Sequence, residues 1–469
     1  MTLTTSDIEE LRSRLGGNLH QPGEPAYEET CSLFNAMITK RPALVARCSA
    51  PLDLVTVIAF AREHEMEFNV RAGGHSVAGL CLNDGGIVAD IRGMDGVHVD
   101  PDRRLALVGG GATWAQVDRE TQKYGLATTG GRVSSTGVGG LTLGGGSGWL
   151  ERKHGFTCDN LVSAEVVTAE GEIVTASADT NPDLFWALKG GGGNFGVVTS
   201  FEFRLHRVGP EVFGGMLVHP FENGPGLMRA WRDVMVDAPE GLSLAFTYMP
   251  MPDDESLPPA IRDQYSAVVI GMFDGSMAEG ERLLAPLREI DGADLDAFGP
   301  IPYVELQCLM DDATGFRNYW GAEQLPALPD AAIEKLHRRC EQRPEGIAQL
   351  FMPAWGGATA RVGSEQSPLT GRDSRFIVHP LMLWEDPADD EVSIAWTRGF
   401  RDDMAEFATG GAYLNFISPE DGERTEDQYG QANHERLAGV KAHWDPENFF
   451  RASGNPVADE AVTVTGSRS

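Results

Sequence analysis

The chain has 469 residues, which is more than one hydrophobic core usually holds, so we expect two or three domains. Its 69 Asp and Glu residues outnumber 38 Lys and Arg residues, and the formal net charge of -31 repels phosphodiester backbones and anionic lipid surfaces. Composition therefore argues against nucleic acid and membranes as partners. A solvated acidic surface explains this charge; attraction of a cationic substrate and adaptation to salt are the alternatives.

Nothing in the sequence predicts export or a membrane anchor. Acidic residues stand near the start, where a signal peptide needs basic residues and an apolar stretch, and no run of about 18 apolar residues occurs. The six cysteines lack C-x-x-C spacing, so neither a disulfide framework nor a metal site is indicated. We expect reduced thiols and a cytoplasmic protein.

The first part of the chain is predicted to contain short strands and helices. Strands are expected at residues 43–47, 68–71, 86–91, 105–109 and 197–206, with a hairpin formed by 161–168 and 172–176. Helices are expected near 6–15, from Pro51 towards Glu63, after the capping residue Thr113, and at 181–189. The turn at Gly73-Gly74-His75 then lies between two strands, as a cofactor loop should.

Three glycine-rich segments stand out, at residues 73–74, 137–146 and 190–196. The stretch 130–148 has too little side-chain material for a core of its own, and such a segment normally wraps a ligand. Gly109-Gly110-Gly111 follows a strand but lacks the G-x-G-x-x-G spacing of a Rossmann fingerprint, and no P-loop is present, so a phosphate site here must be of another kind. Backbone amides of Gly73, Gly74, His75 and Ser76 can line a pyrophosphate without any lysine.

Beyond Pro210 a second domain begins, because the glycine-rich loops give way to longer alternating strands and amphipathic helices. Strands are expected at 212–219, 244–248, 267–273 and 376–384, and helices at 226–236, 278–290, 331–340 and 391–407. A strand at 413–416, a helix at 428–441 and a turn at 445–450 are expected to return to the first domain.

Together these segments resemble the PCMH-type FAD-binding domain of the vanillyl-alcohol oxidase superfamily, and within it the berberine-bridge-enzyme-like oxidases. The resemblance reaches from about Arg41 to the C-terminal region. It implies an α+β fold with a two-part FAD-binding domain at 1–207, completed by 418–469. Residues 208–417 would form a substrate-binding cap with an antiparallel sheet covered by helices, and FAD would lie between the two domains.

The resemblance also implies how FAD is held. The family's pyrophosphate loop reads Arg-Ser/Ala-Gly-Gly-His, and its histidine is bonded to the 8α-methyl carbon of the flavin; His75 matches this position. The alternative is that His75 merely packs in its loop. Many relatives have a second, cysteine tether, but Val133 stands at that place, so the chain is similar to the members linked through one histidine. Cys158 is expected to be a buried structural thiol.

Other matches extend the predicted flavin site. Asp159-Asn160 and the run from Gly191 to Val198 resemble two further flavin segments, and Thr136 stands where oxygen-reactive relatives have valine and dehydrogenases leucine. The predicted cofactor contacts are Arg71, Gly73, Gly74, His75, Ser76, Thr136, Gly137, Gly139, Gly140, Gly144, Gly145, Asp159, Asn160, Gly192, Asn194, Gly196, Val198 and Asn448.

The sequence Tyr413-Leu-Asn415-Phe resembles the family's Tyr-x-Asn-Tyr/Phe strand, whose alternation would place both polar side chains on one face. With a lowered pKa, Tyr413 would accept the substrate proton, and Asn415 would orient a donor or bond to the flavin. A core role for Tyr413 is the alternative. His379 and Trp384 are weaker candidates for the cavity wall, and core packing is the better interpretation of Trp384.

The implied function is transfer of a hydride from a C–H bond of a small alcohol or amine to FAD, with O2 reduced to hydrogen peroxide. A dehydrogenase with another electron acceptor, a carbohydrate oxidase and a non-catalytic flavin carrier are the alternatives. The expected partners are a small-molecule substrate and O2, and the chain is expected to be a monomer or a homodimer.

Overall fold

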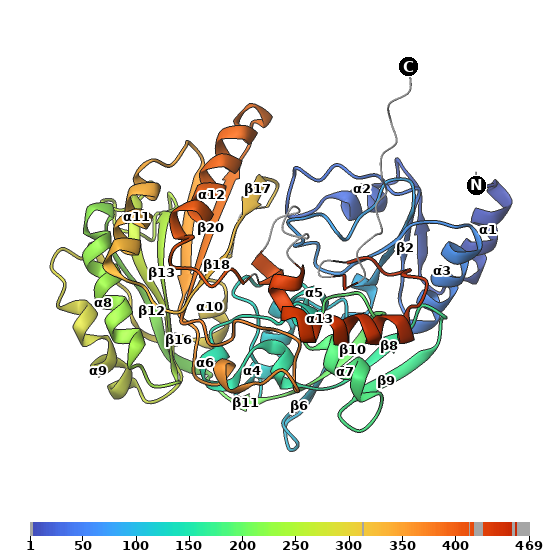
Figure 1. The fold of residues 1–469 in the computed structure, drawn as a ribbon, viewed down its shortest axis with the longest axis horizontal. Helices are drawn as coiled ribbons and strands as arrows, with labels where there is room; N and C mark the ends of the chain where they lie inside the picture. Colours follow the sequence, from blue (N-terminus) through green and yellow to red (C-terminus); the bar gives the residue numbers. More distant parts are fainter. Residues whose placement is uncertain (1–2, 312–313, 412, 417–424, 453–454, 457–469) are drawn as a thin grey trace.

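The computed structural model describes residues 3–311, 314–411, 413–416, 425–452 and 455–456. Figure 1 shows two bodies side by side, one built mainly from the N-terminal part of the chain and one, which we call the cap, built around a large sheet. The fold is α+β, as predicted. In the described part of the chain, no helix is long and apolar enough to span a bilayer.

The N-terminal body begins with a four-stranded sheet. Its strand order is β1 (Asn18–His20), β2 (Leu44–Arg47), β4 (Ile87–Asp90), β3 (Phe68–Arg71). Around it lie α1 (Thr5–Arg14), α2 (Pro25–Cys31) and α3 (Pro51–Glu63). The carboxylate of Asp53 in the first turn of α3 accepts hydrogen bonds from the amides of Ser49 (2.8 Å) and Ala50 (3.3 Å). The predicted strand–helix–strand order is confirmed.

A second sheet of the same body is antiparallel and holds five strands. Their order is β5 (Val97–Asp100), β6 (Leu105–Gly109), β10 (Val197–Arg204), β8 (Leu161–Val167), β9 (Ile173–Ser177). Its helices are α4 (Trp114–Gln122), α5 (Val138–Leu143), α6 (Glu151–His154) and α7 (Pro182–Leu188). The predicted hairpin of β8 and β9 is confirmed, whereas α5 is a helix inside the glycine-rich stretch that the sequence did not indicate.

The C-terminal helix α13 (Thr425–Trp444), interrupted at Gly430, packs against α7 in Figure 1. The guanidinium of Arg436 lies 3.8 Å from the ring centroid of Trp186 on α7. Leu437 and Val440 join the core beneath the five-stranded sheet. The end of the chain therefore returns to the N-terminal body after passing through the cap.

The chain enters the cap after a two-stranded ribbon of β7 (Leu126–Ala127) and β11 (His206–Arg207). The main path of the antiparallel cap sheet is β15 (Leu295–Asp296), β12 (Glu211–Pro220), β14 (Tyr265–Phe273), β13 (Leu242–Pro250), β19 (Ile347–Pro353), β20 (Phe376–Trp384), β17 (Arg317–Trp320). Beside it, β16 (Gly299–Pro302) pairs with β12 and β18 (Glu323–Leu325) pairs with β20. The helices are α8 (Gly224–Val236), α9 (Met277–Arg288), α10 (Tyr303–Gln307), α11 (Asp330–Glu341) and α12 (Asp390–Met404).

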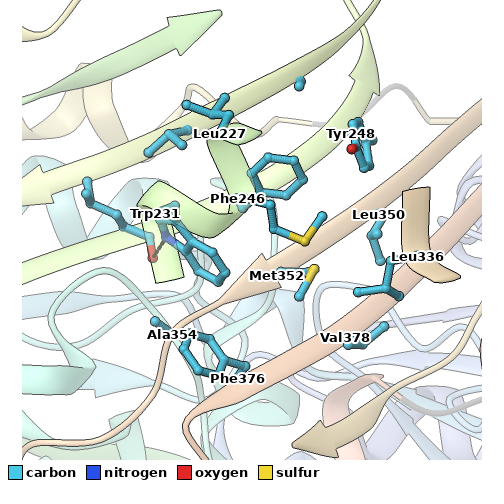
Figure 2. Close-up of a cluster of buried hydrophobic side chains, with 14 of the residues drawn as sticks. Leu227, Trp231, Phe246, Tyr248, Leu336, Leu350, Met352, Ala354, Phe376 and Val378 are labelled. Carbon is cyan, nitrogen blue, oxygen red and sulfur yellow. Dashed lines mark hydrogen bonds between the residues drawn. The ribbon is translucent and has the colours of Figure 1, made fainter. Parts of the chain in front are cut away.

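One face of the cap sheet forms its hydrophobic core under α8 and α11. Figure 2 shows Leu227 and Trp231 of α8 facing Phe246 of β13, while Met352 of β19 and Val378 of β20 lie nearby. Because side chains alternate across a strand, the neighbours of Met352 and Val378 point to the other face of the sheet, towards the N-terminal body. The sequence analysis did not recognise β19.

The strand predicted at residues 413–416 is wrong. Leu414–Phe416 is a short 3-10 helix, closed by a hydrogen bond from the Phe416 amide to the Tyr413 carbonyl (2.9 Å). No neighbouring strand in the described residues pairs with it. The period-2 argument for placing Tyr413 and Asn415 on one face therefore does not apply.

Trp231 is fully buried in the cap core, so a substitution at this residue tests the packing. Its ring packs edge-on against Phe376, with 5.3 Å between ring centroids, and its indole N–H donates to the carbonyl of Leu244. We expect Trp231→Ala to lower the free energy of unfolding by about 3 to 5 kcal/mol, from lost burial and the remaining cavity. Val236→Ala, on the same helix but 44% exposed, should change it by less than about 0.5 kcal/mol. Urea unfolding followed by fluorescence measures both, and equal effects would contradict this packing.

Candidate active site

A cavity of about 360 Å³ lies between the N-terminal body and the cap. All three glycine-rich segments contribute to its wall, and the cap contributes the face of its sheet that turns away from the helices. The wall residues that the sequence predicted are Gly73, Gly74, His75, Ser76, Thr136, Gly137, Gly139, Gly140, Gly144, Gly192, Gly196, Val198 and Asn415. Segments far apart in the sequence are thus brought together as expected.

The first glycine loop follows β3 and turns at Gly74, whose φ is +77°. Within the described residues, the amides of Gly73, Gly74, His75 and Ser76 donate to no protein acceptor, and all four residues line the cavity. Gly74 is buried and the other three residues are partly buried. Amides withdrawn from solvent are normally paired, so four consecutive unpaired donors at a cavity wall indicate a site for an anionic ligand.

Arg71 places a positive charge behind this loop. Its side chain is buried against Gly74, and Nη2 donates to the carbonyl of Ser32 (3.2 Å), whereas Nε and Nη1 have no partner. Burial lowers the pKa of this guanidinium, but an arginine stays charged at any physiological pH. Arg71 does not reach the cavity wall, so it would attract an anion bound there through its charge and not by contact.

The first two glycine loops touch each other through their backbones. A Cβ atom on Gly73 would lie 2.3 Å from the amide nitrogen of Gly137, and a Cβ on Gly137 would lie 2.4 Å from that of Gly73. A Cβ atom on Gly144 would lie 2.1 Å from Oδ1 of the Asn415 side chain. Gly140, in contrast, has nothing within 4 Å and faces open space in the cavity. Glycine is therefore required for loop contact at some positions and leaves room at others.

His75 lies at the cavity wall in the state that a nucleophile needs. Its ring stacks on Phe34 (4.7 Å between centroids) and Nε2 lies 2.9 Å from Oγ of Ser135. Burial lowers the pKa of His75 to about 4, with the nearby Asp311 opposing the shift, so the ring is neutral at pH 7. Only a neutral imidazole has a lone pair with which to form a covalent bond.

The cap contributes two neighbouring pairs of side chains from β19 and β20. Gln349 stands opposite Leu381, and Phe351 stands opposite His379, and all four residues line the cavity. Trp320 of β17 stands opposite Leu381 on its other side, so Gln349, Leu381 and Trp320 lie side by side across three strands. Trp384 belongs to the cap core, as the sequence favoured.

Arg132 is a wall residue that the sequence analysis missed. Its guanidinium donates to Glu151 (2.7 Å) and to Oγ of Ser147 (2.8 Å), and it lies over the rings of Trp149 and Phe351. Both members of the ion pair are buried. The signal for it was a single charged residue inside a glycine-rich segment. Gln349 had a similar signal, as the one polar side chain in an apolar run.

The structure corrects the role of Tyr413. Its side chain is 2% exposed and lies behind the wall, where its hydroxyl oxygen accepts hydrogen bonds from the amides of Gly146 and Ser147, both at 2.8 Å. Burial raises the pKa of Tyr413, although a proton acceptor would need it lowered. Tyr413 therefore positions the second glycine loop. Asn415 does line the cavity, and its Nδ2 donates to the carbonyl of Leu141 (3.0 Å).

Several predicted cofactor contacts lie outside the wall and hold loops in place. Asp159 forms two hydrogen bonds with the buried Arg372 (2.8 and 2.9 Å). Asn160 Nδ2 donates to the carbonyls of His154 and Phe156, and Oδ1 of Asn194 accepts from the amide of Ala452. The other two are Gly145, which bonds through its backbone to Thr142 and Cys158, and Asn448, which accepts from Asn455.

A buried lysine ties the third glycine loop to the end of the chain. Nζ of Lys441 on α13 donates to Asp445 (2.6 Å) and to the carbonyls of Asn194 (2.7 Å) and Phe450 (2.6 Å). Lys441 and Asp445 are both fully buried and form an ion pair, so removing either would leave a buried charge without its partner. This contact holds Phe450 and Ala452 at the cavity wall.

Comparisons with known proteins agree with this geometry. A family profile described as "FAD binding domain" matches residues 42–177, and one described as "Berberine and berberine like" matches residues 412–455. The chain therefore contains an FAD-binding domain and a segment similar to that of berberine-like proteins, and it is an FAD-linked oxidoreductase. This oxidoreductase is 28% identical over 463 residues to (R)-6-hydroxynicotine oxidase of Paenarthrobacter nicotinovorans. The matched region covers 94% of this chain and 96% of the relative.

Other relatives of this oxidoreductase act on different molecules. Xylooligosaccharide oxidase of Thermothelomyces thermophilus is 25% identical, over 90% of this chain and 89% of the relative. Among solved structures, 6-hydroxy-D-nicotine oxidase from Arthrobacter nicotinovorans is 26% identical, with a TM-score of 0.86 over 97% of this chain and 100% of that one. Berberine bridge enzyme from Eschscholzia californica shares the fold, with a TM-score of 0.84 and 20% identity over 96% of this chain and 98% of that one.

The residues present fit FAD. The unpaired amides of residues 73–76 suit its pyrophosphate, the neutral ring of His75 can hold it covalently, and the open space over Gly140 admits a flat group close to the backbone. The glycine contacts offer a test. Gly73→Ala should abolish FAD binding, because the new methyl group would separate the first two loops.

Gly226→Ala is the matched control, since a Cβ there meets nothing within 4 Å and the position lies on α8, away from the cavity. We expect this variant to purify with the same absorbance ratio of flavin to protein as the parent chain. A Gly73→Ala protein that retains full flavin content would contradict the loop contact.

Proposed function

We propose that this oxidoreductase is an oxidase, which takes a hydride from a carbon bearing a hydroxyl or amino group and passes the electrons to O2, giving hydrogen peroxide. Bound FAD supplies the hydride acceptor. The observation that carries the proposal is the single cavity in which unpaired amides and a neutral His75 face the cap sheet. The protein's residues would bind the cofactor on one side and orient the substrate on the other.

The cap side of the cavity supports a substrate that is mainly apolar. Trp320, Phe351, Leu381 and Met310 supply most of this wall, and Gln349 and His379 supply polar atoms. We therefore prefer an apolar natural product or a cyclic amine. The relative named (R)-6-hydroxynicotine oxidase favours this choice. The relative named xylooligosaccharide oxidase keeps a carbohydrate substrate as the alternative.

We further propose that FAD is linked through His75 alone. Val133 lines the cavity at the place of the second tether and has no nucleophilic atom. Cys81 also lines the cavity, but burial raises its pKa to about 11, so its thiol stays protonated at pH 7. Cys158 lies outside the wall, and burial raises its pKa to about 12.

Acid precipitation tests the linkage. The yellow colour should stay in the protein pellet, and mass mapping should find FAD on the peptide containing residues 71–79. In His75→Ala the colour should move to the supernatant, because Cys81 keeps its proton and the other neutral imidazole of the wall, His379, stands on the cap side of the cavity. Matched retention of colour in both proteins would refute attachment at His75, and full release from the parent chain would refute any covalent link.

Reaction with oxygen distinguishes an oxidase from a dehydrogenase. Thr136 lines the cavity, and its small side chain leaves space for O2. The enzyme is first reduced anaerobically with each member of a panel of (R)-6-hydroxynicotine, xylobiose and benzyl alcohol, and the substrate that bleaches the flavin absorbance is kept. We expect the reduced enzyme to be reoxidised in air-saturated buffer far faster than free reduced flavin.

Thr136→Leu should slow reoxidation by at least about tenfold while leaving the bleaching step nearly unchanged, and stopped-flow absorbance measures both rates. Reoxidation of the parent enzyme at the rate of free flavin would favour a dehydrogenase. A chain that no substrate bleaches would favour the non-catalytic carrier. The cytoplasmic location and the monomeric or homodimeric state remain part of this proposal.

A further inference from the structure

His379 is held in one tautomer by its surroundings. Its Nδ1 lies 2.7 Å from the carbonyl oxygen of Gly321, and because a carbonyl only accepts, Nδ1 must carry the hydrogen. In a neutral ring the lone pair is then on Nε2. Stacking on Phe416 (4.0 Å, 13°) and an edge contact with Trp320 (5.4 Å) fix the plane of the ring.

The lone pair on Nε2 is open to the cavity. His379 lines the cavity although only 3% of the residue is exposed, and no hydrogen bond engages Nε2 within the described residues. Nε2 is also absent from the set of side-chain nitrogens that the fold buries without a partner. The unengaged ring atom therefore faces the space that a substrate would occupy.

The other ionisable groups of the described wall cannot accept a proton at pH 7. His75 is assigned to the cofactor, and Cys81 already carries its proton. Arg132 and Arg451 are cations without a lone pair. Carboxylates and tyrosines are missing from the wall as far as the structure describes it, since Tyr413 lies behind it.

We infer that His379 is the proton acceptor of the reaction, taking the hydroxyl or amino proton of the substrate on Nε2 as the adjacent carbon loses its hydride. This inference rests on the proposed function. For an alcohol, the O–H bond breaks, an Nε2–H bond forms, and the C–O bond becomes a carbonyl. The hydride carries two electrons and one hydrogen, and these, together with the proton released from Nε2, convert O2 to hydrogen peroxide.

The electrostatics agree with this role. Burial lowers the pKa of His379 to about 4, the hydrogen bond to Gly321 opposes that shift, and Arg132 lowers the pKa further. Arg132 is itself paired with Glu151, and the facing side chains Gln349 and Phe351 on β19 carry no charge. The ring is thus neutral at pH 7, so the lone pair on Nε2 is free to accept a proton.

Nitrogen NMR of the FAD-loaded enzyme, labelled with 15N-histidine, tests the inference directly. At pH 7 we expect His379 to show an unprotonated Nε2 and a protonated Nδ1, the signal being assigned by its loss in His379→Asn. Phenol, which has a hydroxyl proton to donate, should shift the Nε2 signal, and anisole, which has none, should not. His337, whose Nδ1 bonds to Tyr248 under the cap helices, should respond to neither.

His379→Asn is the informative variant because its Nδ2 can still donate to the Gly321 carbonyl while Nε2 is lost. It should bind phenol about five- to tenfold more weakly and anisole equally well. It should also lower the rate of bleaching by the active panel substrate by about 10² to 10⁴, with partial rescue by added imidazole. His379→Gln serves as a second variant should the first not fold.

Separate results decide the two proposals. A protonated Nε2, a signal that phenol leaves unchanged, or undiminished bleaching by the His379→Asn enzyme would each overturn the role of His379. Failure of every panel substrate to bleach the flavin would count against the proposed oxidase, while the ring signals would still decide whether His379 accepts a hydrogen bond.

Discussion

The direct backbone contact between Gly73 and Gly137 is the constraint on which the rest of the site depends. It brings the turn after β3 against the start of α5, so two loops from the two sheets of the N-terminal body meet without side chains between them. Because the contact uses backbone atoms, the amides of residues 73–76 remain at the surface of the cavity with no protein acceptor.

Segments from the second half of the chain complete that junction. The buried pair Lys441–Asp445 fixes the third glycine loop, and Asp159–Arg372 joins the N-terminal body to a loop that precedes β20. Removing one member of such a buried pair leaves an uncompensated charge, which typically costs about 3 to 5 kcal/mol. The shape of the cavity is therefore coupled to the position of the cap and of the C-terminal helix.

The electrostatics of the site differ from those of the whole chain. The net charge of -31 would repel a pyrophosphate, yet Arg71 lies directly behind the unpaired amides. In the same cavity the two histidines are neutral because burial lowers the pKa of both, and Arg132 is neutralised by Glu151. A local cationic cradle and an otherwise uncharged wall suit an anionic cofactor group beside a reaction that moves a hydride and a proton.

The sequence by itself determined the glycine loops, the strand–turn position of His75, the absence of a nucleophile at Val133 and the α+β order of elements. These features are local, since glycine content, turn residues and hydrophobic period act over a few neighbouring residues. Local pattern failed at residues 413–416, where a motif suggested a strand but none of the described strands pairs with the segment and a 3-10 turn forms instead. Asn415 nevertheless lines the cavity.

Only the tertiary structure decided which polar groups face the cavity and in what protonation state. From the sequence, Tyr413 was the candidate proton acceptor and His379 only a candidate for the cavity wall, and burial behind the wall removed Tyr413 from consideration as a proton acceptor. The carbonyl of Gly321, 58 positions away in the sequence, sets the tautomer of His379. Burial, tautomer and desolvation depend on neighbours that are distant along the chain, so no pattern within one segment specifies them.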